Sequence, residues 1–222
     1  MTGTELITDI RAELTEGTAA FFQDAEILTW INRGESDFVG RTRCLESSAT
    51  ISVTAGRPDY PLPANWLSAK AVFINDENAD GTANWKRLYP TNLEKVSQER
   101  PNFLATDAGS RGVPSKYFIW GNSIWFEDIP DTTGRTVRLF FKSKPIALSA
   151  ATASLNIDDT LADAIKDYAL WRGWKKEKEL DLAESARQSY EMGVRKGLAW
   201  VKKRSGDQVY VLDVRSERPL QQ

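Results

Sequence analysis

The run Lys116-Tyr-Phe-Ile-Trp-Gly-Asn-Ser-Ile-Trp-Phe-Glu127 carries the clearest structural signal in this chain of 222 residues. Aromatic and β-branched residues are concentrated on both sides of Gly121-Asn122, as expected for two strands. A Gly-Asn pair supplies the positive φ angles that a two-residue hairpin turn requires. The sequence therefore predicts a β-hairpin with strands at 116–120 and 123–127.

Further strand-like segments lie on both sides of this hairpin. Residues 60–63, Tyr-Pro-Leu-Pro, must be extended because each proline excludes the preceding residue from the helical region. Residues 91–98 favour one or two helical turns, and 100–114, with two prolines and two glycines, favours a long loop. The remaining strands are predicted at 49–53, 67–74, 85–89 and 135–142. The middle of the chain is thus predicted to be an antiparallel β-domain of five or six strands, a typical sheet size.

Helical periodicity appears before this β-domain. Residues 4–16 and 24–45 repeat apolar residues at a spacing of three to four. Asp24 is predicted to cap the second helix, because its carboxylate can accept hydrogen bonds from the unpaired first-turn amides. Cys44 is expected to be a small, buried or half-buried residue of the same helix.

Two further helices are predicted after the β-domain. One begins near Asp158-Asp159, where either carboxylate can cap it, and the next carries an apolar stripe from Leu182 to Val201. The short connection at 179–181 predicts an antiparallel pair. The predicted fold class is α+β: an antiparallel helical bundle, made of two N-terminal and two C-terminal helices, with an inserted antiparallel β-domain and an extended C-terminal tail. The divisions are 1–47 and 151–206 for the bundle, 48–150 for the β-domain and 207–222 for the tail.

Composition restricts the classes of function. The chain has no histidine and one cysteine, which excludes Ser-His-Asp and Cys-His catalysis, histidine metal sites and an internal disulfide. Hydrophobic residues make up 41% and charged residues 27%, a profile typical of a globular protein. No apolar run approaches the roughly 18 residues that a membrane span needs. The N-terminus lacks the basic start and apolar core of a signal peptide, which predicts synthesis in the cytosol.

Several acidic motifs have the residue types of cation sites or paired acids, and each has a structural alternative. Asp76-Glu-Asn-Ala-Asp-Gly81 matches the first half of a calcium loop, but Arg87 occupies the position where a bidentate glutamate is needed. The acidic residues between 158 and 167 lie near a predicted helix start, where carboxylates stabilise the helix dipole. We therefore expect no metal, no cofactor and no catalytic residue, and the chain is predicted not to be an enzyme.

Aromatic and basic residues are the remaining candidates for binding. Trp120 and Trp125, two of eight tryptophans, flank the predicted hairpin turn as core residues or as an exposed pair. An exposed pair suits a protein interface or stacking on a sugar or nucleobase. Residues 161–204 carry eleven Lys/Arg against seven Asp/Glu in a chain of net charge −2. This surplus favours either an acidic partner or an ordinary solvated helix surface.

The segment Gln208-Val-Tyr-Val-Leu-Asp-Val214 is strand-like but has no local hairpin partner. An uncovered apolar strand promotes aggregation. A neighbouring subunit or a partner could cover it by strand addition, or it could pair with this chain's own sheet. The sequence leaves both alternatives open.

Five segments occur in a characteristic order: Leu28-Thr-Trp-Ile-Asn32, Tyr60-Pro-Leu-Pro63, Pro114 to Phe126, Phe140-Phe-Lys-Ser-Lys-Pro145 and Asp167-Tyr-Ala-Leu170. Their order and spacing, which cover most of the chain, resemble those of tailed-bacteriophage head-to-tail adaptor proteins with a β-insertion, also called head-completion or connector proteins. None of the five is a catalytic signature.

The resemblance implies a structural virion protein in the neck, at the head-tail interface, made in the host cytoplasm. Such proteins form a ring of about a dozen copies beneath the portal protein. The ring extends the DNA channel, through which genomic DNA passes without sequence-specific binding, and gives tail or nozzle proteins a docking platform. No membrane partner is implied. The alternative is a virion-associated module that binds a host-surface glycan through the aromatic β-domain.

The resemblance also indicates which residues would make these contacts. The C-terminal tail would bind the portal through Val209, Tyr210, Val211, Leu212 and Val214. Trp120 and Trp125 would face tail proteins. The basic residues that would face the portal or the channel are Lys175, Lys176, Arg195, Lys196, Lys202, Lys203 and Arg204.

Overall fold

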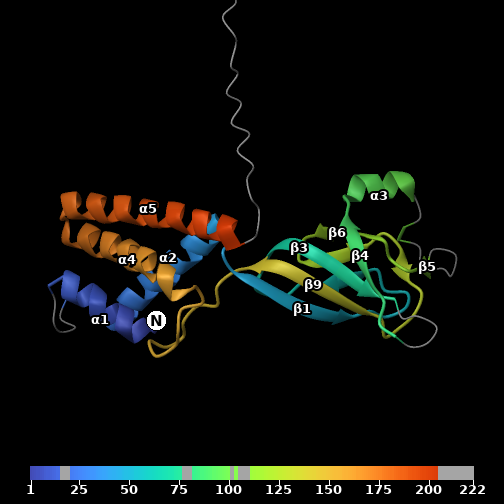
Figure 1. The fold of residues 1–222 in the computed structure, drawn as a ribbon, viewed down its shortest axis with the longest axis horizontal. Helices are drawn as coiled ribbons and strands as arrows, with labels where there is room; N and C mark the ends of the chain where they lie inside the picture. Colours follow the sequence, from blue (N-terminus) through green and yellow to red (C-terminus); the bar gives the residue numbers. More distant parts are fainter. Residues whose placement is uncertain (16–20, 77–81, 101–102, 105–110, 205–222) are drawn as a thin grey trace, which may run out of the picture.

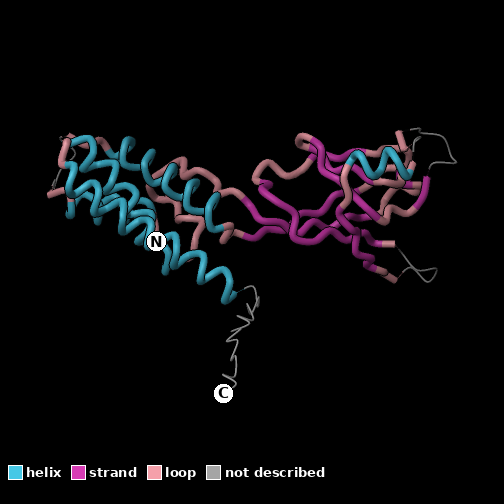
Figure 2. The backbone as a smooth tube through the Cα atoms, turned by 90° about the horizontal axis from the view of Figure 1, so that it is seen from above, coloured by secondary structure: helices cyan, strands magenta, loops and turns pink. Residues whose placement is uncertain are grey.

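The computed structural model describes residues 1–15, 21–76, 82–100, 103–104 and 111–204. They form two bodies placed end to end: a helical body of α1, α2, α4 and α5, and a strand body that holds all the strands and α3 (Figure 1). The view from above separates the same two bodies (Figure 2). The α+β class is therefore confirmed.

The helices are α1 (Gly3–Glu13), α2 (Asp24–Thr42), α3 (Leu93–Glu99), the 3₁₀ turn η2 (Asp159–Leu161), α4 (Ala162–Glu177) and α5 (Leu180–Arg204). The strands are β1 (Glu46–Ser52), β2 (Asp59–Pro61), β3 (Trp66–Asn75), β4 (Trp85–Pro90), β5 (Arg111–Gly112), β6 (Lys116–Trp120), β7 (Ser123–Phe126), β8 (Ile129–Pro130) and β9 (Thr136–Ser143). The described residues thus hold nine strands where five or six were predicted. Two of the additional strands, β5 and β8, are only two residues long and occur where loops and turns were expected, and β2 forms in the segment expected to be extended.

A capping box starts α1 and was not predicted. The Thr2 hydroxyl accepts a hydrogen bond from the Glu5 amide at 3.3 Å, and the Glu5 carboxylate accepts one from the Thr2 amide at 2.8 Å. The helix ends at Glu13, earlier than predicted, and Thr15 has a left-handed φ of 55°.

The predicted cap of α2 was wrong. Gln23 is the N-cap residue and Asp24 is the first residue of the helix. The Asp24 carboxylate instead accepts a hydrogen bond from Arg11 Nη2 at 2.6 Å, which ties the start of α2 to α1. α2 ends at Thr42 because Arg43 adopts a left-handed conformation with φ 52°.

The chain crosses from the helical body to the strand body just after α2. Cys44 lies in this crossing and is buried, so its predicted burial is confirmed, but its predicted place in a helix was wrong. The Ser143 amide donates to the Leu45 carbonyl at 3.1 Å, which joins the crossing to the end of β9. The chain then returns to the helical body through residues 144–158.

The two C-terminal helices form where predicted. Asp158 caps η2, because its carboxylate accepts a hydrogen bond from the Thr160 amide at 3.0 Å. Lys178, with a left-handed φ of 68°, turns the chain from α4 into α5. The two helices pack side by side (Figure 1). Gly193 allows their close approach, since a Cβ there would lie 2.6 Å from the Ala164 Cβ.

One apolar core joins all four helices of the helical body. α4 contacts α1, α2 and α5, and α2 also contacts α1 and α5. The fully buried members include Leu6, Ile10, Ile27, Ile31, Phe38, Ile165 and Ala169. The helical body therefore needs both ends of the chain. A single antiparallel bundle, and domain boundaries at 47, 150 and 206, stay predictions.

The strand body contains a seven-stranded sheet in the order β1-β9-β3-β4-β6-β7-β2. Neighbouring strands are antiparallel except β4 and β6, which are parallel, and β5 and β8 form a separate parallel pair. The purely antiparallel prediction was therefore wrong for these two pairs. Between β4 and β6 the chain makes a long crossover through α3, and a crossover of this kind is what parallel strands require.

The hairpin predicted at 116–127 is confirmed. β6 and β7 pair with Phe118 opposite Trp125 and Trp120 opposite Ser123, and Gly121 has a φ of 59°. A second apolar core lies on the inner face of the sheet, separate from the helical core. Its members include Val72, Ile74, Leu88, Ile124, Phe126, Val137, Leu139 and Phe141.

Candidate assembly surfaces

The predicted portal-binding residues 209–214 lie outside the described residues, but the structure places the point from which they depart. α5 ends at Arg204, which lines a cavity of about 340 Å³ together with Trp200. Leu45 and Glu46, where β1 begins, line the same cavity. The end of α5 therefore lies beside the first residue of β1.

The seven predicted basic residues fall into two groups, and the first lies where α4 turns into α5. It consists of Lys175 and Lys176, both exposed. Lys176 Nζ donates to the Glu26 carboxylate at 2.6 Å and lies 4.7 Å from the ring centroid of Phe21. Lys176 therefore also joins α4 to the start of α2.

The second group lies on the C-terminal half of α5, toward the strand body. The Arg204 guanidinium lies 5.0 Å from the ring centroid of Trp200. At 1.5 Å per residue, roughly 22 Å of α5 separates Leu180 from Arg195 and roughly 36 Å separates it from Arg204. The two groups therefore do not form one continuous surface. The second group is Arg195, Lys196, Lys202, Lys203 and Arg204, all exposed.

Trp120 and Trp125 differ in what they present to a partner, although both lie on the same face of the hairpin. Trp120 is 62% exposed beside the turn. Trp125 is half-buried and stacks on Phe118, with ring centroids 6.0 Å apart and planes inclined by 16°. Phe103 packs edge-on against the same Phe118 ring at 6.2 Å. Trp120 is therefore the member of the pair that is open to a protein contact.

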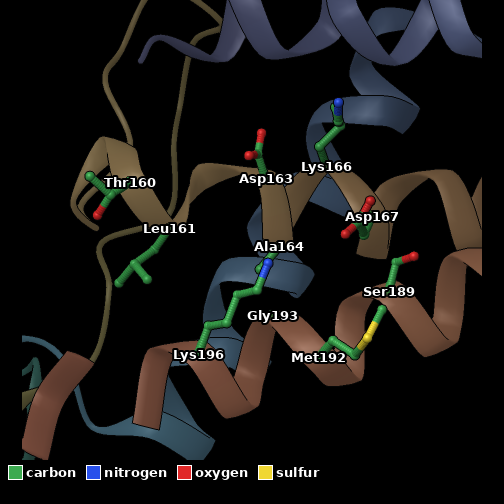
Figure 3. Close-up of a pocket in the computed structure, with 10 residues that line it drawn as sticks. All are labelled: Thr160, Leu161, Asp163, Ala164, Lys166, Asp167, Ser189, Met192, Gly193 and Lys196. Carbon is green, nitrogen blue, oxygen red and sulfur yellow. The ribbon is translucent and has the colours of Figure 1, made fainter. Parts of the chain in front are cut away.

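A groove of about 360 Å³ lies between α4 and α5 (Figure 3). Asp163 and Asp167 of α4 line it, and Lys196 of α5 lies across from them (Figure 3). Lys166, also in the groove lining, donates to the Glu13 carboxylate at 2.8 Å. Burial raises the pKa of Asp167 to about 6. The chemistry that this arrangement supports is protonation of one carboxylate in mildly acidic solution.

A polar clamp between α2 and the returning connection was missed by sequence reasoning. Glu35 is 1% exposed, and its carboxylate accepts from the amides of Asn156 at 2.6 Å and Ile157 at 3.2 Å, and from Asn156 Nδ2 at 3.0 Å. Asn32 exchanges two hydrogen bonds with the Leu148 backbone, at 3.1 and 2.7 Å. Burial raises the pKa of Glu35, although its hydrogen bonds oppose the shift. The available signal in the sequence was that Glu35 lies four positions after Ile31, on the side of α2 that carries the apolar residues.

An aromatic patch on the outer face of the sheet was also missed. Phe73 and Phe140 pack edge-to-face with centroids 5.9 Å apart, and Arg138 lies 5.2 Å from the ring centroid of Trp85. Phe140 is 38% exposed and Trp85 is 40% exposed. Phe73 and Phe140 line an apolar depression of about 300 Å³. This patch, opposite the buried face, is a second candidate surface for protein contact.

The calcium-like segment begins at Asp76, and its residues 77–81 lie outside the described part of the chain. The Asp76 carboxylate accepts from Lys86 Nζ at 2.5 Å and lies 3.3 Å from Arg135 Nη2. The hydrogen bond from Lys86 lowers the pKa of Asp76. Among the described residues, no cluster of three or more His, Cys, Asp or Glu side chains is arranged to hold a metal ion. No described helix is long and apolar enough to cross a membrane.

Comparison with known proteins adds one strong match. A family model described as "SU10 adaptor protein" matches residues 1–215, which include both bodies. None of the curated proteins matches the chain. One solved structure, described as "Neck of empty GTA particle computed with C6 symmetry", has a chain with 17% sequence identity, and the match covers 74% of each chain with a TM-score of 0.29. A likeness at that TM-score carries no inference for this chain.

Proposed function

The chain belongs to the SU10 adaptor protein family, and from this membership we propose that it joins the head of a phage particle to its tail. The match to residues 1–215 is the observation that carries the proposal, because it spans both bodies and most of the C-terminal segment. It also agrees with the resemblance to tailed-bacteriophage head-to-tail adaptors that the order of the sequence segments indicates. The protein then acts structurally, in the virion neck, and not as an enzyme.

In the proposed assembly, about a dozen copies form a ring beneath the portal protein. The ring extends the channel through which genomic DNA passes, and tail or nozzle proteins dock on it. A closed ring requires two complementary surfaces on every copy. The elongated arrangement of two bodies supports this role, since each body can contact a different neighbour (Figure 1). Synthesis in the host cytoplasm precedes assembly.

The proposed contacts follow from where the candidate residues lie. Residues 209–214 bind the portal, and the basic side chains at the end of α5 stand next to the point where this segment departs. Those cations suit an acidic portal surface or the DNA backbone. Trp120, exposed in the strand body, suits a tail-side protein.

Native mass spectrometry of the protein co-expressed with the portal protein of the same genome tests this proposal. We expect a portal-bound ring of one fixed copy number, because closed cyclic assemblies have fixed stoichiometry. Deleting residues 207–222 should abolish the complex, whereas deleting only 216–222, beyond the family match, should preserve it. A monomer that never binds the portal would overturn the adaptor role. A complex that survives both deletions would overturn only the role of the tail.

A further inference from the structure

The two edges of the seven-stranded sheet differ in how they are protected against an added strand. β2, at one edge, has three residues and ends in Pro61, and shortness and proline both block further pairing. β1, at the other edge, has seven residues, Glu-Ser-Ser-Ala-Thr-Ile-Ser, without proline or lysine. Its ladder with β9 is regular from Glu46 to Ser52, without a bulge. Apart from the charged Glu46 at its first residue, β1 therefore has none of the usual devices that close an edge.

The hydrogen bonds at both ends of β1 show which of its backbone groups face the open edge. The Val53 amide donates to the Arg135 carbonyl at 2.8 Å, and the Leu45 carbonyl accepts from the Ser143 amide at 3.1 Å. Odd-numbered residues therefore direct their backbone groups toward β9. Because antiparallel ladders alternate, the even-numbered residues direct theirs to the open edge. The residues of β1 whose backbone groups face the open edge are Glu46, Ser48, Thr50 and Ser52. None of the described residues pairs with this edge.

We propose that residues 208–214 of the same chain pair with the open edge of β1 as an eighth strand in the free protein. α5 ends at Arg204 in the cavity that Glu46 also lines. The three residues between Arg204 and Gln208 span up to about 11 Å, which brings Gln208 within reach of Glu46. The segment and β1 have the same length of seven residues. A short tether keeps the effective concentration near the millimolar range, which favours the chain's own segment over any other.

The orientation and the side-chain pattern of this pairing follow from the topology. β1 runs away from the helical body, so a segment leaving the same junction lies parallel to it (Figure 1). Alternation places Gln208, Tyr210, Leu212 and Val214 on one side of the added strand and Val209, Val211 and Asp213 on the other. The first set, with three large apolar or aromatic side chains, suits the inner face, where Ala49 and Ile51 are half-buried at the margin of the core. The second set carries the charged Asp213 and then faces outward.

The inference goes beyond the proposed function, because it concerns the protein before it meets a portal. Pairing on β1 would cover an apolar segment and an open edge at once, and both are aggregation hazards when exposed. Portal binding would then require the segment to leave β1. The pairing is tested on the isolated protein, so its failure leaves the adaptor role and its own test untouched.

Hydrogen exchange of the full-length protein alone provides the test. We expect every second amide of residues 208–214, those that would face β1, to exchange at least about tenfold more slowly than in Thr50→Pro. Proline at residue 50 removes a donor that faces the open edge and leaves the β9 ladder intact, so slow exchange in 136–143 reports that the sheet still folds. Thr50→Ala, which keeps the amide, is the matched control and should retain the protection of 208–214.

A variant on the segment itself keeps the test valid if proline at residue 50 disturbs the sheet. Leu212→Pro lies outside the described structure and should remove the protection of 208–214 while the sheet stays protected. Rapid, unprotected exchange of 208–214 in the wild type would overturn the proposal, as would protection that survives Leu212→Pro. Protection that rises with protein concentration would overturn it too, because it would assign the segment to the β1 edge of a second copy.

Discussion

The helical body and the strand body differ in how far apart in the sequence their contacting residues lie. Contacts in the helical body join residues more than a hundred positions apart, such as Glu35 with Asn156 and Arg41 with Glu191. The sheet lies within one continuous segment, 46–143. The strand body can therefore be completed by that segment alone, whereas the helical body depends on contacts between the two ends of the chain. Unfolding experiments can test whether this difference extends to stability.

The largest effect is expected from Phe38→Ala in the helical body. Phe38 is fully buried, and a Cβ at Gly197 would lie only 2.6 Å from its ring, so the aromatic side chain fills the space between α2 and α5. Removing it should lower the free energy of unfolding of the helical body by about 3–5 kcal/mol. Urea unfolding followed by circular dichroism should show a helical transition at lower urea, with the sheet transition unchanged.

Leu198→Ala is the matched control for this variant. Leu198 is 40% exposed on α5, so its replacement should change the free energy of unfolding by less than about 0.5 kcal/mol. If Phe38→Ala shifts the helical and sheet transitions together, the two bodies unfold as one unit and the contrast between them fails.

The second effect concerns Glu35 in the polar clamp between α2 and the returning connection. Glu35→Ala leaves the amides of Asn156 and Ile157 without their acceptor, which should cost about 2–3 kcal/mol. Because burial raises the pKa of Glu35, the folded state holds its proton more tightly than the unfolded state. Wild-type stability should therefore fall as pH rises from the ordinary carboxyl range to the raised pKa, and stay level above it. Urea unfolding between pH 4 and pH 7 measures this, and a Glu35→Gln profile with the same slope would contradict it.

Sequence reasoning succeeded where the cause is local and failed where it is distant. Gly121-Asn122 fixed the hairpin because a turn depends on its own two residues, and the Asp158 cap depends on an amide two positions away. Asp24 was misassigned because its partner is Arg11 on another helix. Glu35 went unnoticed because the amides that it binds lie 121 and 122 residues further along the chain.

Interactions between residues distant in the sequence also explain why parts of the sheet and of the candidate surfaces could not be predicted. The parallel pairing of β4 and β6 could not be predicted, because it depends on where a crossover through α3 returns the chain. The sequence shows the surplus of basic residues on the C-terminal helices, but charge alone does not say that one group lies at the end of α4 and the other on the C-terminal half of α5. The aromatic patch of Phe73 and Phe140 arises from neighbouring strands that are far apart in sequence.

A smaller effect is expected at the groove between α4 and α5. Burial raises the pKa of Asp167 from 3.8 to about 6, so its contribution to stability is full below pH 3.8 and is lost as pH rises to about 6. Asp167→Asn should remove this dependence of stability on pH. It should also make the protein more stable at pH 7 by roughly 1 kcal/mol, a value reduced because Asp167 is half-exposed. Thermal unfolding between pH 4 and pH 8 measures it. Asp163→Asn, an exposed neighbour in the groove, is the control and should keep the dependence on pH.

The smallest effect on stability is expected at Trp120, and it tests the strand body as a docking surface. Trp120 is 62% exposed, so Trp120→Ala should change the free energy of unfolding by less than about 0.5 kcal/mol. If Trp120 anchors a tail-side protein, the same variant should weaken that binding by about 2 kcal/mol, close to thirtyfold, as measured by titration of portal-bound rings. Trp85→Ala, on the outer face of the sheet, is the matched control and should leave the binding constant unchanged. The reverse result would place tail docking on the patch of Phe73, Phe140 and Trp85, since that patch is the other exposed aromatic surface of the strand body.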